Sequence, residues 1–334
     1  MARIFHLPQL FCSHHHFRVG ELLRQVVLDL KDQCVGAVAM PNLVPAILTA
    51  PQAMAYWEQI RAAGYAGIPF MTIKLTPETT PAMICEAAQH PEIRAAKLYP
   101  DGVTTNSEGG VRDFSALDEV YAEMERVGMH LLLHGEMPGV YSLHAEQRFL
   151  SELQRIATKF PKLRITLEHI TTAEAVDAVW HLRKNVTATI TLHHLLLTTD
   201  DVIGSKIQPH NFCKPVAKQS HDRMALLLAA FSGNPKFRFG SDSAPHLMGT
   251  KECAEGCAGV YTAPIMVPLL VEIFDRHDRL NMLANFTSGF AAAWFGLDLS
   301  SQKILTVVNR PSIVPALCGQ VVPFMAGKTI SWSL

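Results

Sequence analysis

The sequence has no long apolar run. Its longest apolar stretches, residues 263–274 and 289–297, are too short or too interrupted by proline to span a bilayer, which needs ~20 residues. The first twenty residues also lack the charged, apolar and small-residue segments of a signal peptide. We therefore expect a soluble protein of the cytoplasm with no membrane partner.

An excess of either charge is also missing. Lys and Arg number 29 and Asp and Glu number 30, which gives a formal net charge of -1. No overall field therefore attracts nucleic acid, and an anionic substrate needs cationic side chains placed locally at its site.

Cysteine is sparse and has no regular pattern. Seven cysteines are an odd number scattered through a long chain, which argues against a disulfide framework and for a reducing compartment. Cys253 and Cys257 lie close together, but no second Cys or His pair follows at the spacing of a zinc finger. We interpret them as ordinary thiols, with a structural zinc site as the alternative.

The sequence does contain enough apolar residues for a large core, arranged in alternating short and long segments. Hydrophobic residues make up 49% of the 334 residues. Short apolar runs alternate with segments of helical periodicity, which is typical of repeated βα units around a parallel sheet. Eight runs are expected to be strands, the number that closes a (β/α)8 TIM barrel. These runs are one that ends near residue 16, then 35–42, 68–75, 95–99, 130–134, 164–169, 186–192 and 237–242.

The rest of the chain fits one domain. Thr171 followed by Glu174 forms a capping box that predicts a helix over residues 175–183. The proline-containing tail is expected to be extended or irregular and to wrap around the barrel. We predict a single domain over residues 1–334, of which residues 304–334 are a C-terminal extension that packs on the barrel.

Polar residues follow the expected strands at their C-terminal ends, where barrels of this type build active sites. Residues two apart in a strand face the same side, so His14 and His16 can point to one metal while His15 points away. Each histidine alone has a simpler interpretation, as part of a polar surface run or as a hydrogen-bonded core side chain. Their convergence on one rim favours metal binding, because buried imidazoles and carboxylates need partners. The predicted metal ligands are His14, His16, Lys97, His134, His169 and Asp242.

Lys97 lies inside an apolar strand, where a charged amine is costly to bury unless it is paired. One interpretation is a buried ion pair. The other is that the neutral amine reacts with carbon dioxide to give N6-carboxylysine, whose two oxygens bridge two divalent cations. Imidazole and carboxylate ligands favour two Zn²⁺, with Mn²⁺ or Co²⁺ as substitutes.

Two cations of this kind hold a bridging hydroxide and support the hydrolysis of an amide. We predict that Asp242 is a ligand and also the catalytic group, moving a proton between the attacking water and the leaving nitrogen. The alternative role of Asp242 is a structural loop cap.

Two further features predict a substrate site. Arg18 lies two residues after His16, and Asn42 ends the next strand, so a guanidinium and an amide are placed to bind a substrate carboxylate. The alternative for Arg18 is an ordinary surface position. Residues 101–110 are rich in glycine and small hydroxyl residues and predict a mobile loop that closes over the site, or else a solvated loop without that task.

Eight segments spread over nearly the whole chain carry a family resemblance. They are residues 14–18 (HHHFR), 40–43 (MPNL), 96–100 (AKLYP), 104–107 (TTNS), 133–136 (LHGE), 168–172 (EHITT), 240–246 (GSDSAPH) and 323–327 (PFMAG). Together they resemble the dihydroorotases of the amidohydrolase superfamily, specifically the type that is a separate homodimeric enzyme.

The resemblance implies the reversible cyclisation of N-carbamoyl-L-aspartate to L-dihydroorotate, a step in pyrimidine synthesis. It implies that His14, His16 and Asp242 bind one metal. His134 and His169 then bind the other, and carboxylated Lys97 is the bridge. The residues implied for substrate binding are Arg18, Asn42, His246, Lys214, Ala258, Thr104 and Thr105.

Two positions depart from the family pattern. Family members usually carry an acidic residue two before the first histidine and another after the arginine, whereas this chain has Cys12 and Val19. Cys12 lacks the carboxylate that supports the first histidine pair, which puts the orientation of that pair in question. We still predict an active enzyme, because every direct ligand is present. The alternatives are another cyclic-amide hydrolase, such as a hydantoinase or allantoinase, and a catalytically silent relative that acts as a partner subunit.

Overall fold

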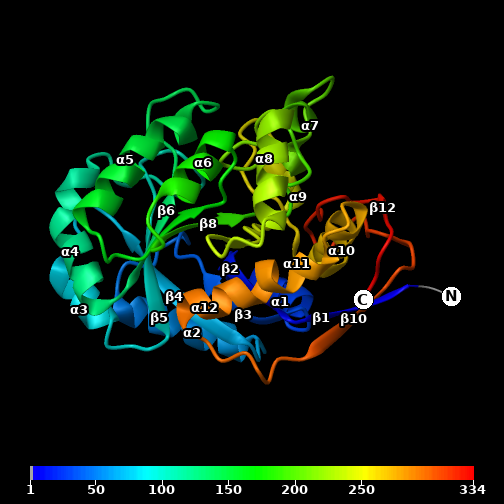
Figure 1. The fold of residues 1–334 in the computed structure, drawn as a ribbon, viewed down its shortest axis with the longest axis horizontal. Helices are drawn as coiled ribbons and strands as arrows, with labels where there is room; N and C mark the ends of the chain where they lie inside the picture. Colours follow the sequence, from blue (N-terminus) through cyan, green and yellow to red (C-terminus); the bar gives the residue numbers. More distant parts are fainter. Residues whose placement is uncertain (1–2) are drawn as a thin grey trace.

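Eight parallel strands form one sheet in the computed structural model, which describes residues 3–334 (Figure 1). The sheet closes because Asp242 N donates to His14 O (3.0 Å) and His16 N donates to Ser243 O (3.3 Å), which joins the ends of the first and last strands. The prediction of a (β/α)8 TIM barrel is therefore confirmed. The strands are β2 (Leu10–His15), β3 (Cys34–Ala39), β4 (Ile68–Leu75), β5 (Ile93–Leu98), β6 (His130–His134), β7 (Ile165–Glu168), β8 (Val186–Ile190) and β9 (Phe237–Phe239).

All eight predicted strands are present, although several are shorter than expected. β4 and β6 have the predicted bounds, but β3 and β9 each end three residues early, at Ala39 and Phe239. Asp242 has a φ of 43°, outside the extended region, so it cannot continue β9. The polar residues therefore stand on turns that follow the strands and project over the barrel mouth.

Helices cover the outside of the barrel between successive strands (Figure 1). One predicted helix was misplaced: it begins and ends two residues earlier than predicted, and its N-cap is Thr172 rather than Thr171, with Thr172 Oγ1 accepting from Ala175 N (3.1 Å). Thr171 instead donates its N–H and hydroxyl to the carboxylate of Glu146. The helices are α1 (Gly20–Leu30), α2 (Ala50–Ala62), α3 (Pro81–Ala87), α4 (Asp118–Val127), α5 (Ala145–Lys159), α6 (Ala173–His181), α7 (Asp200–Ile203), α8 (Ser220–Phe231), α9 (Met248–Lys251), α10 (Met266–Arg276), α11 (Leu280–Ala284) and α12 (Phe290–Phe295).

An aromatic cluster fills the N-terminal end of the barrel. Phe11 and Phe70 lie near the starts of β2 and β4, and Phe295 of α12 packs against both, with ring centroids 5.5 to 5.6 Å apart. All three side chains are buried. Water is therefore excluded from this end of the barrel, and only the C-terminal mouth is left for chemistry.

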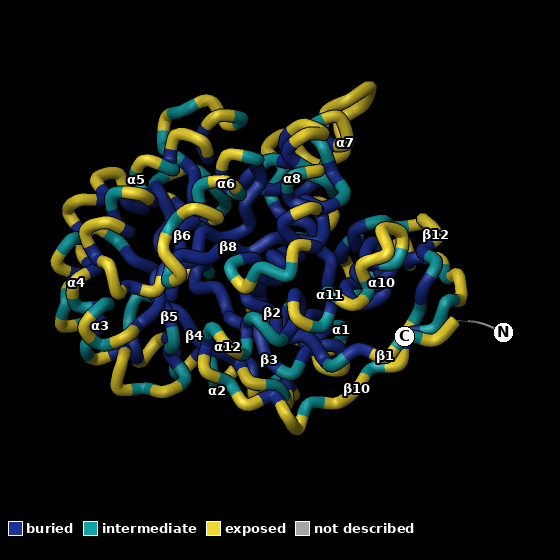
Figure 2. The backbone as a smooth tube through the Cα atoms, viewed as in Figure 1, coloured by how far each residue is buried: buried dark blue, intermediate teal, exposed yellow. Residues whose placement is uncertain are grey.

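The chain after α12 returns to the N-terminal segment. β10 (Ile304–Val308) pairs antiparallel with β1 (Ile4–Pro8), and β11 (Ser312–Ile313) pairs with β12 (Thr329–Ile330). β1 and β10 consequently lie side by side in Figure 1, and Figure 2 shows exposed backbone along this outer edge and buried backbone in the barrel strands. Across residues 3–334, no helix has both the length and the apolar character needed to cross a membrane.

Candidate metal centre

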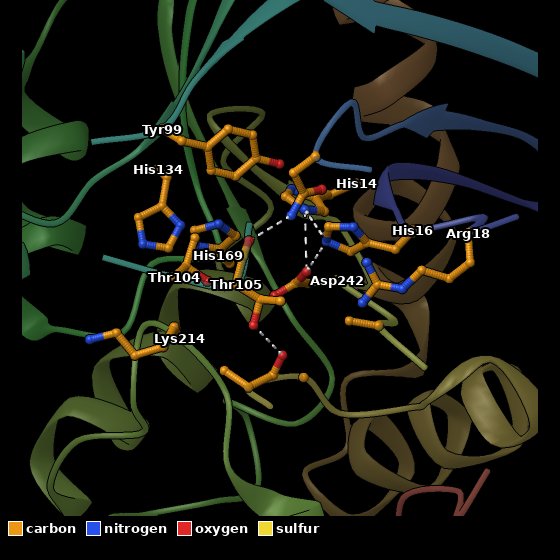
Figure 3. Close-up of a pocket in the computed structure, with 14 residues that line it drawn as sticks. His14, His16, Arg18, Tyr99, Thr104, Thr105, His134, His169, Lys214 and Asp242 are labelled. Carbon is orange, nitrogen blue, oxygen red and sulfur yellow. Dashed lines mark hydrogen bonds and ion pairs between the residues drawn. The ribbon is translucent and has the colours of Figure 1, made fainter. Parts of the chain in front are cut away.

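Three predicted ligands meet at the junction of the first and last strands (Figure 3). His14 Nε2 and His16 Nε2 are 3.3 Å apart, and they lie 3.2 and 2.9 Å from Asp242 Oδ1. His15, between them, turns away and places Nδ1 3.0 Å from Ser241 Oγ. The alternation of side chains along β2 thus brings His14 and His16 to one point, as the sequence predicted.

The chemistry of this group suits a cation. All three side chains are buried, and their nitrogen and oxygen atoms face one another closely enough to share one metal ion. Burial alone would raise the pKa of Asp242, but the adjacent His14 and His16 hold the pKa of its carboxyl well below the usual range, so it is anionic. Two imidazoles and a carboxylate are a ligand set that zinc prefers.

The backbone is strained at two predicted ligands. Asp242 and His169 both have φ values of 43°, in the left-handed region that residues with a Cβ seldom adopt. Such conformations persist where the surrounding structure enforces them, and they concentrate at functional sites.

A second group lies beside the first. The rings of His134 and His169 are 4.7 Å apart between centroids, and His169 is 5.1 Å from His14 in the same measure. Nδ1 of His169 is buried with no hydrogen-bond partner among the described residues. Burial, followed by the charge of Lys97, lowers the pKa of His169 well below the usual range, so its ring is neutral and able to bind a cation.

Lys97 is fully buried and forms an ion pair with Glu168 Oε2. The same oxygen of Glu168 lies 3.0 Å from His14 Nδ1. Burial lowers the pKa of Lys97, although Glu168 opposes this shift. The unmodified side chain of Lys97 adopts the first of the two interpretations, the ion pair with Glu168. The second interpretation needs a neutral amine, and the lowering of the Lys97 pKa by burial acts in that direction.

Glu168 supplies a carboxylate next to the first histidine pair, where Cys12 has none. Cys12 Sγ accepts from Ser241 N (3.2 Å) and lies 3.1 Å from Ser241 Oγ, so its thiol contacts the chain just before Asp242 rather than a histidine ring. The carboxylate beside His14 comes from Glu168 instead. Val19, the other departure, is 47% exposed and precedes α1, where it makes no side-chain cap.

Glu136 and Tyr99 belong to the site, but neither of them was assigned a role from the sequence. Glu136 Oε2 lies 2.8 Å from His134 Nε2, and Glu136 Oε1 accepts from Lys214 Nζ at 3.0 Å. Tyr99 lines the pocket, and the centroid of its ring is 5.0 Å from Lys97 Nζ. The signal for both was their place in the segments AKLYP and LHGE, directly after β5 and β6.

Four of the predicted substrate residues, Arg18, Thr104, Thr105 and Lys214, lie around the metal residues in the pocket (Figure 3). Arg18 Nε donates to Pro245 O (3.1 Å), and Arg18 Nη2 lies 3.0 Å from His246 Nε2. Burial and the charge of Arg18 lower the pKa of His246 to about 2, so His246 is neutral and accepts from the guanidinium. Arg18 is buried and lines the pocket, so the alternative of a surface arginine is wrong.

The loop over residues 101–110 contacts the rest of the pocket through Thr105 and Asn106, whose Nδ2 donates to Asn42 O (3.1 Å). Thr105 Oγ1 donates to Ala258 O, and Asn42 Nδ2 donates to Thr105 O, both at 3.3 Å. His246 and Lys97 lie behind the pocket surface, whereas the other predicted substrate and metal residues line it. The residues that line the pocket are His14, His16, Arg18, Asn42, Tyr99, Thr104, Thr105, His134, His169, Lys214, Asp242, Ala244, Ala258 and Gly259.

Comparison with known proteins identifies the family. Residues 37–242 match the model of the amidohydrolase family. The chain is 42% identical to a dihydroorotase of Idiomarina loihiensis over 331 residues, which cover 96% of each protein. The crystal structure of a dihydroorotase from Campylobacter jejuni has a TM-score of 0.93 at 36% identity and covers 100% of this chain and 98% of that one.

A second solved relative is dihydroorotase from Saccharomyces cerevisiae in complex with 5-fluoroorotic acid, with a TM-score of 0.92 at 35% identity. The alignment covers 99% of this chain and 98% of the yeast chain. The barrel and its site define an amidohydrolase. Within that superfamily, the chain belongs to the dihydroorotase family.

Proposed function

We propose that this protein is a dihydroorotase that interconverts L-dihydroorotate and N-carbamoyl-L-aspartate in pyrimidine synthesis. The observation that carries the proposal is the convergence of His14, His16 and Asp242 on one point beside the buried guanidinium of Arg18. The first group suits a metal that activates water, and the arginine suits a substrate with a carboxylate. The family relationship over nearly the full chain supports the same activity.

The residues present fit two divalent cations, which we propose are Zn²⁺, with Mn²⁺ or Co²⁺ as substitutes. His14, His16 and Asp242 would hold one cation, and His134 and His169 the other. Lys97 would join them as N6-carboxylysine, with Glu168 then remaining on His14 Nδ1. When bound, such a pair of cations polarises a carbonyl and lowers the pKa of water to ~7.

Asp242 is the proposed proton carrier. Its Oδ1 faces the two imidazoles, and its carboxylate also reaches the pocket surface. In the hydrolytic direction the C–N bond of the cyclic amide breaks, the carbonyl carbon gains the oxygen of water, and the nitrogen gains a proton. The carboxylate of Asp242 takes that proton from water and passes it to the nitrogen, and the reverse direction returns it.

Arg18 and Asn42 would bind the substrate carboxylate, together with backbone groups near Ala258 and Lys214, and His246, which was predicted to bind it too, would support Arg18 from behind the pocket surface. His246 acts through Arg18, because its neutral ring accepts a hydrogen bond from the guanidinium and fixes its plane. Thr104 and Thr105 would close the loop over the bound acid, using the contact between Thr105 and Ala258 O that is already present.

We also propose that the protein forms a homodimer in the cytoplasm, as a single domain over residues 1–334 with residues 304–334 as an extension on the barrel. The antiparallel pairing of β10 with β1 supports the last point, because it fixes the start of the extension to the N-terminal segment. Sedimentation of the purified protein would test the homodimer: a species of twice the chain mass is expected, and a monomer would reject it.

A substrate panel tests the proposed activity. Purified protein would be assayed with dihydroorotate, hydantoin and allantoin. Two charge-assisted hydrogen bonds to the carboxylate contribute about 3 kcal/mol, so hydantoin, which lacks that group, should react ~100-fold less efficiently. Arg18→Gln should lose most of this preference, while Arg183→Gln, at an exposed position, should keep it. A folded, metal-bound protein that does not turn over dihydroorotate would reject the proposal, and efficient turnover of hydantoin or allantoin instead would identify the rival hydrolase.

A further inference from the structure

A second cluster of potential metal ligands does not line the catalytic pocket. His193 and His194 follow β8, and Cys213 lies in the segment between α7 and α8. All three side chains are buried, with exposures of 0%, 2% and 1%. One ligand atom from each lies within 4.8 Å of the others. None of them was assigned to the hydrolytic reaction, so the cluster needs an account of its own.

His194 is oriented toward Cys213. Thr191 Oγ1 lies 2.8 Å from His194 Nδ1 and fixes the ring, so that Nε2 lies 3.4 Å from Cys213 Sγ. The carbonyl oxygen of Pro215 is 3.0 Å from the same Nε2 and 3.4 Å from Cys213 Sγ. A nitrogen, a sulfur and a carbonyl oxygen therefore surround one small volume. Metal-binding histidines usually have a hydrogen-bond partner on the far ring nitrogen, and the Thr191 hydroxyl takes that place here.

His193 gives the second, independent observation. Both of its ring nitrogens are buried without a hydrogen-bond partner among residues 3–334. Its ring centroid is 4.4 Å from that of His194. A neutral imidazole always has one N–H donor and one acceptor, and leaving both unpaired in the interior costs about 1–3 kcal/mol for each group. A bound cation would satisfy one nitrogen directly.

The separation of Cys213 Sγ and His194 Nε2 matches a zinc ion. Zinc binds sulfur at about 2.3 Å and histidine nitrogen at about 2.0–2.1 Å in a tetrahedral arrangement, which places the two donor atoms about 3.5 Å apart. The observed separation of Cys213 Sγ and His194 Nε2 is 3.4 Å. Pro215 O completes a set of two nitrogens, one sulfur and one oxygen.

We propose that His193, His194 and Cys213 bind a structural zinc ion, separate from the catalytic centre, with the carbonyl of Pro215 as the fourth ligand. The ion links the segment after β8 to residues 213–215. This second segment carries Lys214, which lines the catalytic pocket and donates to Glu136. The zinc ion therefore fixes one wall of the pocket, which deepens the proposed function without taking part in its chemistry.

Cobalt substitution tests the site through its sulfur ligand. The catalytic ligands named above are imidazoles, a carboxylate and a modified lysine, so only a cysteine site gives thiolate-to-cobalt charge-transfer absorption in the near ultraviolet. The protein would be reconstituted with Co²⁺, and its spectrum and metal content compared with those of Cys213→Ser and His193→Gln. Cys34→Ser, which removes another buried free thiol, is the matched control.

The wild type and Cys34→Ser should show the charge-transfer band, and Cys213→Ser should lose both the band and about one equivalent of cobalt. His193→Gln should weaken the band, which keeps the test usable if Cys213→Ser does not fold. Absence of the band from the folded wild type, or its persistence in Cys213→Ser, would overturn the proposal. Because the band is read without substrate, either result stands apart from success or failure of the hydrolysis assay.

Discussion

Lys251 is expected to control substrate affinity without touching the substrate. It ends α9, is only 4% exposed, and donates from Nζ to Gly259 O (2.6 Å), Cys257 O (2.9 Å) and Phe212 O (3.3 Å). One ammonium thus holds together the two chain segments that carry Ala258 and Lys214 to the pocket.

The effect of Lys251→Met can be estimated from these contacts. Methionine has nearly the same length but no donor, so two short charge-assisted hydrogen bonds of about 1.5–3 kcal/mol each are lost. Relaxation of the loop and access of water recover part of this energy. If about 2 kcal/mol remains as the cost of ordering the segment around the substrate, KM for dihydroorotate rises ~30-fold. The metal residues are not contacted, so kcat should change less than about 3-fold.

The charge of Lys251 adds a pH dependence to the same prediction. Burial lowers the pKa of Lys251 to about 8. Below that pH the ammonium has three donors for three carbonyls, and above it the neutral amine has only two. KM should therefore rise as the pH increases through about 8, and Lys251→Met should lack this rise. Steady-state kinetics over pH 6 to 10 would measure both effects, with the exposed Lys206→Met as control. An unchanged KM in Lys251→Met, or an equal fall in kcat, would refute the reasoning.

Two further predictions concern the loop and the support of β7. Thr105→Val removes the 3.3 Å hydrogen bond to Ala258 O, worth about 0.5–1 kcal/mol, so KM should rise ~2- to 5-fold with kcat nearly unchanged; a large loss of kcat would contradict a closing role. Glu146 is buried and accepts from the N–H and hydroxyl groups of Thr171 and Thr172. Glu146→Ala should lower the free energy of unfolding in urea by about 3 kcal/mol and Glu146→Gln by about 1 kcal/mol, and equal stabilities would show that these bonds contribute little.

The barrel could be predicted because its strands are short apolar runs that end in polar residues. β4 and β6 were bounded correctly for this reason, and His134 was placed at the mouth because it directly follows three leucines. The alternation of side chains in a strand was enough to bring His14 and His16 together and to separate His15 from them.

The partner of Lys97 could not be predicted, because it depends on a local break in alternation. Consecutive strand residues face opposite sides, so strand alternation alone does not bring Glu168 and His169 to the same interior. The φ of 43° at His169 interrupts the extended conformation there. Glu168 can then pair with Lys97 and His14 while His169 faces the pocket. Nor did the sequence indicate the His193, His194 and Cys213 cluster, since Cys213 lies 19 residues beyond His194.

Side chains on or just after five strands, β2, β5, β6, β7 and β9, are proposed to bind catalytic cations at one mouth of the barrel. Zinc content and dihydroorotate hydrolysis should be measured together on the wild type, Lys97→Ala, Asp242→Ala and the exposed control Lys184→Ala. The wild type and the control should bind at least about two zinc ions at the catalytic centre and turn over substrate, whereas the other variants should bind less zinc and lose turnover by ~1000-fold or more. Equal zinc content and equal turnover in all four proteins would contradict the claim.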